Sequence, residues 1–401
     1  HPTRGRRREA MRILETVFPL LWSPAPDDRF TLARLYLAEG EWRKAAGQLK
    51  LLVAAEGAEL RYLAAYVGAL FALGDAAAAE SWIARMEEVA AGEFATVGLR
   101  ADALLNRGKV DETIETLRAD LGDPKSQPQE RRARLELAVN YLLGRAGRGN
   151  PRDQRGLASQ LLAEAEKMRR DYADEFPEQE ILIAVILARQ GRLEEALELA
   201  ERAWDRADAP AIAGALAALQ AGGASGPDEL KRIEAILVAA LEKHQRAVQL
   251  LLTLANVRLF QELHEEAESL FREALAAGPN VVAMNNLAVL LALQTTRLTE
   301  ARRLIDEAIA LGGPISQLLD SRATVYLALG KSGEALADLE AALAEAPSGT
   351  SYFHKAQVHY GAGEEEAAAD ALAAAHRLGL TAEELMPLER PAYQTLKAAL
   401  E

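Results

Sequence analysis

The side chains of this sequence that could do chemistry are six histidines and several adjacent carboxylates. His354 and His359 lie five residues apart, which turns them about 140° from each other on a helix, a poor arrangement for one metal ion. The sequence has no H-E-x-x-H pair, no glycine-rich phosphate loop and no G-x-S-x-G elbow. We therefore interpret the histidines as structural or surface residues and predict no metal site. The other four are His1, His244, His264 and His376.

Adjacent glutamates such as Glu194/Glu195 and Glu265/Glu266 would suit acid–base catalysis. They recur just before a small residue at the start of an expected helix, where acidic side chains gain about 0.3–1 kcal/mol from the helix dipole. This recurrence indicates helix capping. The sequence has no cysteine, which excludes cysteine nucleophiles, thiolate zinc sites and disulfides. We predict no catalytic residue and no cofactor, so the chain is not expected to be an enzyme.

The composition favours helices and argues against nucleic acid as a ligand. Of 401 residues 81 are alanine, the best helix former, and only 5% are aromatic. The net charge of −14 opposes binding to phosphate backbones. No apolar run approaches the ~20 residues that span a bilayer, so no membrane insertion is expected. A cytoplasmic location is the expectation. A periplasmic one is the alternative if a signal or anchor precedes His1, since the sequence lacks an initiator Met and is expected to be part of a longer protein.

One segment is basic within this acidic chain. Between Gln129 and Arg170 ten Lys or Arg residues stand against five Asp or Glu residues. A solvated loop and helix face is the favoured interpretation of this charge. The alternative is a contact with an acidic partner. It would use Arg145, Arg148, Arg152 and Arg155.

The chain repeats itself with a period of about 34 residues. Gly40, Gly74 and Gly108 are 34 residues apart. Prolines recur at nearly the same period, at Pro177, Pro210, Pro279, Pro314 and Pro347. Small residues recur near the start of the expected second helix of each unit, at Ala45, Ala78, Thr113, Ala196, Ala267, Ala301, Ala335 and Ala368. Three ladders with one period indicate a repeat array.

Each unit is predicted to be a pair of antiparallel helices. In residues 251–279, apolar or small residues follow the i, i+3, i+4 rhythm of an amphipathic helix in both halves. A break of a few residues between the halves forces a helical hairpin. Ala255 and Ala267 would let the two backbones approach, and Pro279 would end the second helix.

These units resemble tetratricopeptide repeats. The family pattern has an apolar-plus-small pair on the first helix and then Ala, a large apolar residue, Ala and a closing Pro on the second. Residues matching it in one unit are Leu254, Ala255, Ala267, Phe271, Ala274 and Pro279. A second copy contains Ala323, Tyr326, Gly330, Ala335, Leu339, Ala342 and Pro347. The resemblance covers nearly the whole chain.

The resulting prediction is an all-α, right-handed α-solenoid of about ten antiparallel helix hairpins with a C-terminal capping helix. Residues 1–22 are expected to form the second helix of a truncated repeat. Residues 23–219 would hold the N-terminal repeats with a loop insertion at 144–156, and residues 220–380 the C-terminal repeats. Residues 381–401 are expected to form the capping helix, with Thr381 as N-cap and Glu384 three residues later.

The resemblance implies that a partner segment binds on the concave face, which the first helices line. The outward residues of the last four first helices are the candidates: Leu252, Asn256, Phe260, Asn285, Asn286, Gln317, Asp320, Phe353, Gln357 and Tyr360. An Asn amide can grip a peptide backbone in two directions. The alternative is that Asn285 and Asn286 only decorate a helix start.

Some relatives in this family hold a C-terminal carboxylate with two asparagines and three cationic residues. Asn256 and Asn286 match the two asparagine positions. The cationic positions fall on Leu252, Gln317 and Ser321, none of which is charged. Without cations the carboxylate loses its charge-assisted hydrogen bonds. We therefore expect a neutral to apolar groove that suits an apolar or amide-rich peptide.

The predicted function is a non-catalytic scaffold that binds a peptide or protein segment on the concave face. The alternative is an interaction or regulatory segment of a larger bacterial protein, such as a kinase, a glycosyltransferase or an exopolysaccharide-secretion component. The sequence leaves the oligomeric state open.

Overall fold

The computed structural model describes residues 4–20, 24–55, 58–90, 92–122, 127–147 and 155–400. Within these ranges the regular elements are α-helices and short 3₁₀-helices, with no strand. The chain divides into two compact units, one formed by Arg7–Arg192 and the other containing Leu193–Glu401. Along the chain the division between the units falls between Arg192 and Leu193.

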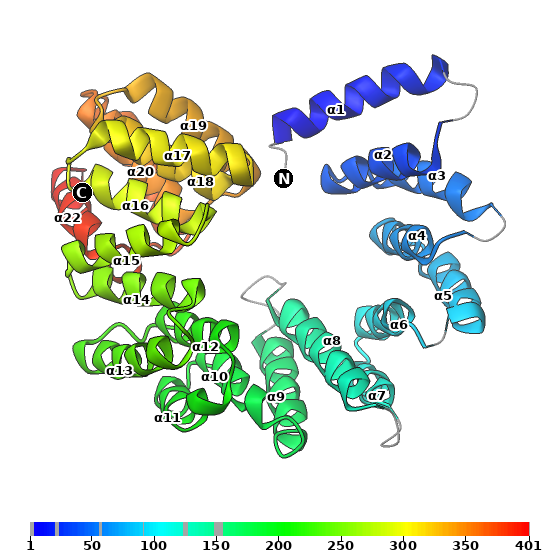
Figure 1. Cartoon of the computed structure of the whole chain (residues 1–401). Coiled ribbons are helices and arrows are strands. Elements are labelled where there is room, and N and C mark those ends of the chain that lie inside the picture. Colours follow the sequence, from blue (N-terminus) through cyan, green and yellow to red (C-terminus); the bar gives the residue numbers. More distant parts are fainter. Residues whose placement is uncertain are drawn as a thin grey trace. The chain divides into compact units, whose positions relative to one another are not determined.

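The first unit consists of helix pairs preceded by a single helix (Figure 1). Met11 of the single helix α1 joins the apolar core of the following helices. The elements are α1 (Arg4–Val17), η1 (Phe18–Leu20), α2 (Pro26–Ala38), α3 (Trp42–Val53), α4 (Leu60–Ala72), α5 (Ala76–Ala90), α6 (Phe94–Asn106), α7 (Val110–Asp120), α8 (Pro128–Ala146), α9 (Arg155–Asp171), η2 (Pro177–Leu182) and α10 (Ile183–Arg189).

The second unit continues the same design through five helix pairs, α12/α13 to α20/α21. Its elements are α11 (Leu193–Ala203), η3 (Trp204–Arg206), α12 (Ala209–Ala221), α13 (Pro227–Lys243), α14 (Val248–Phe260), α15 (His264–Ala276), α16 (Val281–Leu293), α17 (Leu298–Gly312), α18 (Ser316–Ala328), α19 (Ser332–Glu345), α20 (Gly349–Gly361), α21 (Glu365–Arg377), η4 (Ala382–Glu384), η5 (Pro387–Glu389) and α22 (Arg390–Leu400). Each described pair matches a predicted hairpin.

The glycine ladder marks the turn inside several of the hairpins. Gly40 has a φ of 76°, which is the left-handed region where only glycine avoids a Cβ clash. The next amide, Glu41 N–H, donates to the Tyr36 carbonyl at 2.9 Å and closes the end of α2. Gly74 and Gly108 have φ values of 78° and 73° at the equivalent positions. The period seen in the sequence is therefore the period of this turn.

The ladder of small residues occupies the contact between the two helices of a pair. Ala45, Ala267 and Ala335 are all fully buried there. In the second hairpin the buried residue is Ala79, whereas Ala78, the residue expected from the sequence, is only partly buried. Ala79 stands five residues after Gly74, the same offset as Ala45 from Gly40. Counting from the turn glycine therefore corrects the prediction by one residue.

The C-terminal segment differs from the expected single helix over 381–401. Only Arg390–Leu400 is α-helical, and Thr381 with Glu384 form a capping box for the three-residue helix η4. Pro387 has no amide hydrogen and interrupts the helix. Helix α22 still covers the last hairpin, because its Tyr393 and Leu396 lie in one apolar cluster with Phe353. Residues 381–389 take a separate path, which shapes the pocket described below.

Candidate functional site

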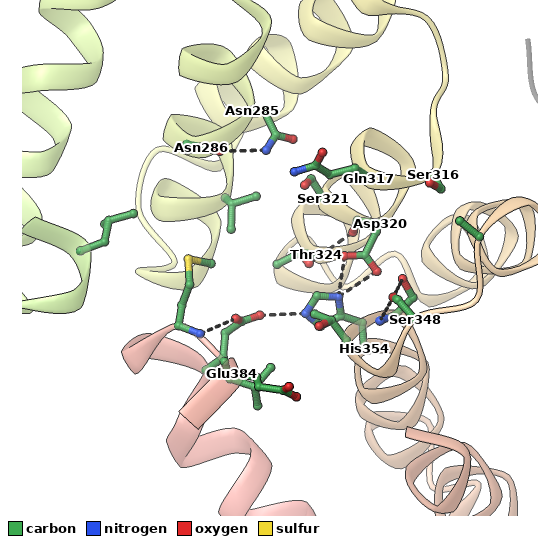
Figure 2. A pocket seen from close by; sticks show the side chains of 18 of the residues that line it. Asn285, Asn286, Ser316, Gln317, Asp320, Ser321, Thr324, Ser348, His354 and Glu384 are labelled. Carbon is green, nitrogen blue, oxygen red and sulfur yellow. Dashed lines mark hydrogen bonds and ion pairs between the residues drawn. The ribbon is translucent and has the colours of Figure 1, made fainter. Parts of the chain in front are cut away.

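A pocket of about 480 Å³ lies on the first helices of the last four hairpins. Polar side chains from α14, α16, α18 and α20 converge on it, and the C-terminal segment 381–389 forms another wall (Figure 2). Its volume is in the range of small-ligand and peptide sites. The lining residues are Asn256, Leu259, Phe260, Asn285, Asn286, Val289, Ser316, Gln317, Asp320, Ser321, Thr324, Ala346, Pro347, Ser348, Thr350, Ser351, His354, Glu384, Leu385, Met386 and Glu389.

The pocket brings together six of the ten residues that the sequence singled out for the concave face. They are Asn256, Phe260, Asn285, Asn286, Gln317 and Asp320. They come from α14, α16 and α18, so equivalent positions in consecutive repeats do converge in space.

The other four residues lie outside the pocket lining. The expectation that Phe353 faces a ligand is wrong, because its side chain is fully buried in the core of the last hairpin. The ring of Phe353 packs edge-on against Tyr393, with centroids 5.7 Å apart. Leu252 packs against the apolar cluster of α14–α18, and Gln357 and Tyr360 lie further along α20.

Three asparagines form a hydrogen-bonded chain along one wall. Asn285 Nδ2 donates to Asn286 Oδ1 at 3.0 Å, and Asn286 Nδ2 donates to Asn256 Oδ1 at 3.1 Å. Asn285 is only 6% exposed, and its Oδ1 has no hydrogen-bond partner among the described residues. A buried amide oxygen without a donor carries a cost of about 1–3 kcal/mol. The wall is therefore a polar network with one unused acceptor.

A buried histidine between two carboxylates forms the opposite wall. His354 Nδ1 lies 3.0 and 3.1 Å from the two oxygens of Asp320, and His354 Nε2 lies 2.8 Å from Glu389 Oε1. Burial alone would lower the pKa of His354. The charges and hydrogen bonds of Asp320 and Glu389 outweigh this effect and raise that pKa to about 10. Both ring nitrogens of His354 therefore donate protons at neutral pH.

The C-terminal segment 381–389 is anchored to the pocket through this histidine and through apolar side chains. Met386 and Leu388 pack against the apolar cluster of α14–α18, and Leu385 is buried against the last hairpin. Met386 N–H donates to the second oxygen of Glu389 at 3.3 Å. Sequence reasoning missed this wall because it assigned the whole segment to one helix.

The described arginines of the basic segment form contacts within the chain. Arg145 forms an ion pair with Asp102, and its guanidinium lies 5.3 Å from the centroid of the Tyr141 ring. Arg169 is buried and forms an ion pair with Glu136 at 2.7 Å. Arg148, Arg152 and the side chain of Arg155 lie outside the described residues. In the part that the structure describes, these two basic residues are therefore held by neighbours in the chain.

Among the described residues that line the pocket there is no Lys or Arg. Gln317 and Ser321, two positions where a carboxylate-binding relative would have cations, do line it. None of the described His, Asp and Glu side chains is grouped as a metal site. Among the described helices, none has the length and apolar character required to cross a membrane.

Successive helical hairpins with a recurring glycine turn and a recurring small residue define a helical-repeat protein. The tetratricopeptide repeat model matches residues 252–314 and 321–379, which cover α14–α17 and α18–α21 almost completely. Helices α14–α21 are thus matched as tetratricopeptide repeats. Repeats of this kind generally mediate protein–protein interaction through their concave surfaces. No curated protein matches the chain.

Solved structures similar to this chain include other repeat proteins. A tetratricopeptide repeat protein from Parabacteroides merdae is 18% identical, with a TM-score of 0.44, over 76% of this chain and 98% of that one. The Cut9–Hcn1 hetero-tetramer of the APC/C gives 14% identity and a TM-score of 0.43 over 99% of this chain and 88% of that one. Yeast Tom70 gives 14% identity and a TM-score of 0.37 over 93% and 96%.

Proposed function

We propose that this protein is a non-catalytic interaction scaffold that binds a segment of a protein partner in the pocket on α14, α16, α18 and α20. The observation that carries the proposal is the convergence of polar side chains from four successive first helices on one concave site. In a repeat array these helices line the binding surface.

The chemistry of the walls suits an extended peptide. The asparagine chain offers amide groups of the type that pair with backbone N–H and C=O groups. Leu259, Phe260 and Val289 add apolar surface beside it. A peptide needs both kinds of contact, because its backbone groups must be satisfied while its side chains leave water.

Peptides selected on the purified chain from a random display library provide the test. The double variant Asn256→Ala/Phe260→Ala changes one polar and one apolar wall residue and should weaken the selected peptides at least about tenfold. Asn140→Ala, an exposed asparagine on the first helix α8, is the matched control and should leave affinity unchanged. Circular dichroism checks that both variants are folded. Unchanged affinity of the double variant would place binding outside this pocket.

A further inference from the structure

The pocket lining carries more negatively than positively charged groups. Asp320, Glu384 and Glu389 contribute three carboxylates, and His354 contributes the one cation. With His354 protonated, two negative charges remain uncompensated within the lining. Since no Lys or Arg is among the described lining residues, nothing else in the lining offsets them.

Two carboxylates of the pocket, those of Asp320 and Glu389, lie within hydrogen-bond distance of a buried histidine. His354 is only 5% exposed, and burial opposes its charge, yet the neighbouring carboxylates keep it protonated. A cation brought in by a ligand would meet Glu384 and the exposed part of Asp320, because Glu389 is buried and both of its oxygens already accept hydrogen bonds. Glu384 is exposed, so its charge is directly accessible to such a group.

A second, independent feature favours a hydrogen-bond donor as the ligand. Asn285 is buried at the pocket wall with its Oδ1 unpaired among the described residues. Figure 2 labels Asn285 together with Gln317, Asp320 and His354 among the side chains that line the pocket. An ammonium or guanidinium group carries several N–H donors and no acceptor, which fits both an unpaired acceptor and an excess of carboxylates.

From these features we propose that the pocket recognises a positively charged side chain, lysine or arginine, of the partner segment. This proposal rests on the proposed function and deepens it, because it names the chemistry of the residue that enters the site. A cationic ligand differs from the neutral to apolar ligand that the sequence predicts, because His354, Glu384 and Glu389 are not among the pocket residues that the repeat pattern identifies. The segment 381–389 supplies two of the three carboxylates and is thus part of the recognition surface.

The test uses the full chain and the peptides selected on it by display. We expect the selected peptides to be enriched in lysine or arginine. Replacing that residue by norleucine should weaken binding about tenfold at low salt, and the loss should shrink as salt screens the charges. Glu384→Gln should weaken the cationic peptide several-fold and leave its norleucine analogue unchanged. Asp320→Asn is a second variant with the same expected direction.

Glu383→Gln is the matched control. Glu383 is the exposed neighbour of Glu384 and lies outside the pocket lining, so this variant changes the net charge equally without changing the site. The selected peptides could instead be neutral or acidic and still bind more weakly to Asn256→Ala/Phe260→Ala. That result would overturn the cationic specificity and leave the proposed function standing. If the double variant binds the selected peptides with unchanged affinity, both the proposed function and the cationic specificity are overturned.

Discussion

His354 Nε2 lies 2.8 Å from Glu389 Oε1, and this bond joins helix α20 to the C-terminal segment 35 residues later. The other ring nitrogen of His354 pairs with Asp320, 34 residues earlier. Both separations are close to one repeat period, with Asp320 on α18, His354 on α20 and Glu389 at the end of η5, after the last hairpin. The stacked first helices thus bring together groups that are far apart in sequence, and the C-terminal segment adds Glu389 from outside the hairpins.

The first prediction concerns the stability that this histidine provides. Removing it in His354→Ala leaves Asp320 and Glu389 without their shared cation, and breaking a buried ion pair costs about 3–5 kcal/mol. We expect a loss of that size in the free energy of unfolding, measured with urea. Hydrogen exchange in residues 381–389 should also become faster. His359→Ala is the matched control on the same helix, because its partner Glu364 is exposed and such pairs contribute at most about 1 kcal/mol. Equal losses of unfolding free energy in His354→Ala and His359→Ala would contradict a stabilising role for the buried His354 ion pairs.

The second prediction is the pH dependence of the same interaction. The pKa of His354 is raised from 6.5 to about 10, since Asp320 and Glu389 favour its charged form against the effect of burial. A group with a raised folded-state pKa stabilises the fold fully below its unfolded pKa. That stability declines as pH rises from 6.5 and is lost as pH passes through about 10. The difference in unfolding free energy between the wild type and His354→Ala should therefore narrow over this range. A difference in unfolding free energy that stays constant with pH would refute the raised pKa of His354.

Most of the helical architecture follows from short-range physics that the sequence displays directly. A turn that needs a positive φ selects glycine at Gly40 and Gly74, and a close helix contact selects alanine at Ala45 and Ala335. Both requirements recur in several units, so they appear as a period. The exception of Ala78 and Ala79 arose within a run of four alanines, where residue type alone cannot identify the buried position.

The third prediction tests the small residue of the helix contact. Ala335 is fully buried between α18 and α19 beside Ala323 and Leu339, so Ala335→Leu overpacks the hairpin. Overpacking costs about 1–3 kcal/mol, which should appear as a lower urea midpoint. Ala337→Leu makes the same change at an exposed position of α19 and should alter the stability by less than about 0.5 kcal/mol. Similar effects at the two positions would argue against a tight contact at Ala335.

The fourth prediction uses one hairpin in which the turn glycine is missing. Glu262 occupies the turn between α14 and α15 with a φ of 61°, where a side chain is strained. Glu262→Gly removes backbone strain of about 1–2 kcal/mol from the folded state. It also raises the conformational entropy of the unfolded chain, which lowers the free energy of unfolding by about 0.4–1 kcal/mol. A small net stabilisation is therefore expected. Gly330→Ala, at the same place in a later hairpin with a φ of 70°, should destabilise. Thermal unfolding of both variants gives the signs, and a loss of stability in Glu262→Gly would contradict this account.

The pocket was harder to predict from the sequence than the helices were. Its asparagines could be placed because they occupy outward positions of first helices whose register was known. His354 and Glu389 could not be placed, because their roles depend on the path of residues 381–389. Pro387 was the available signal, since a proline in the middle of an expected helix indicates a break. Where the chain goes after such a break depends on tertiary contacts such as those of Met386 and Leu388.

The fifth prediction orders the members of the asparagine chain. Asn286→Ala removes the acceptor for Asn285 Nδ2 and the donor to Asn256 Oδ1 at once. Asn285, buried and with its Oδ1 already unpaired, then loses its described amide bond, which should cost about 1–3 kcal/mol. Asn256→Ala breaks a single bond at the end of the chain and should cost less, about 0.5–1.5 kcal/mol. Urea titrations of the two variants measure the difference. A greater loss in Asn256→Ala than in Asn286→Ala would show that Asn286 does not link the other two.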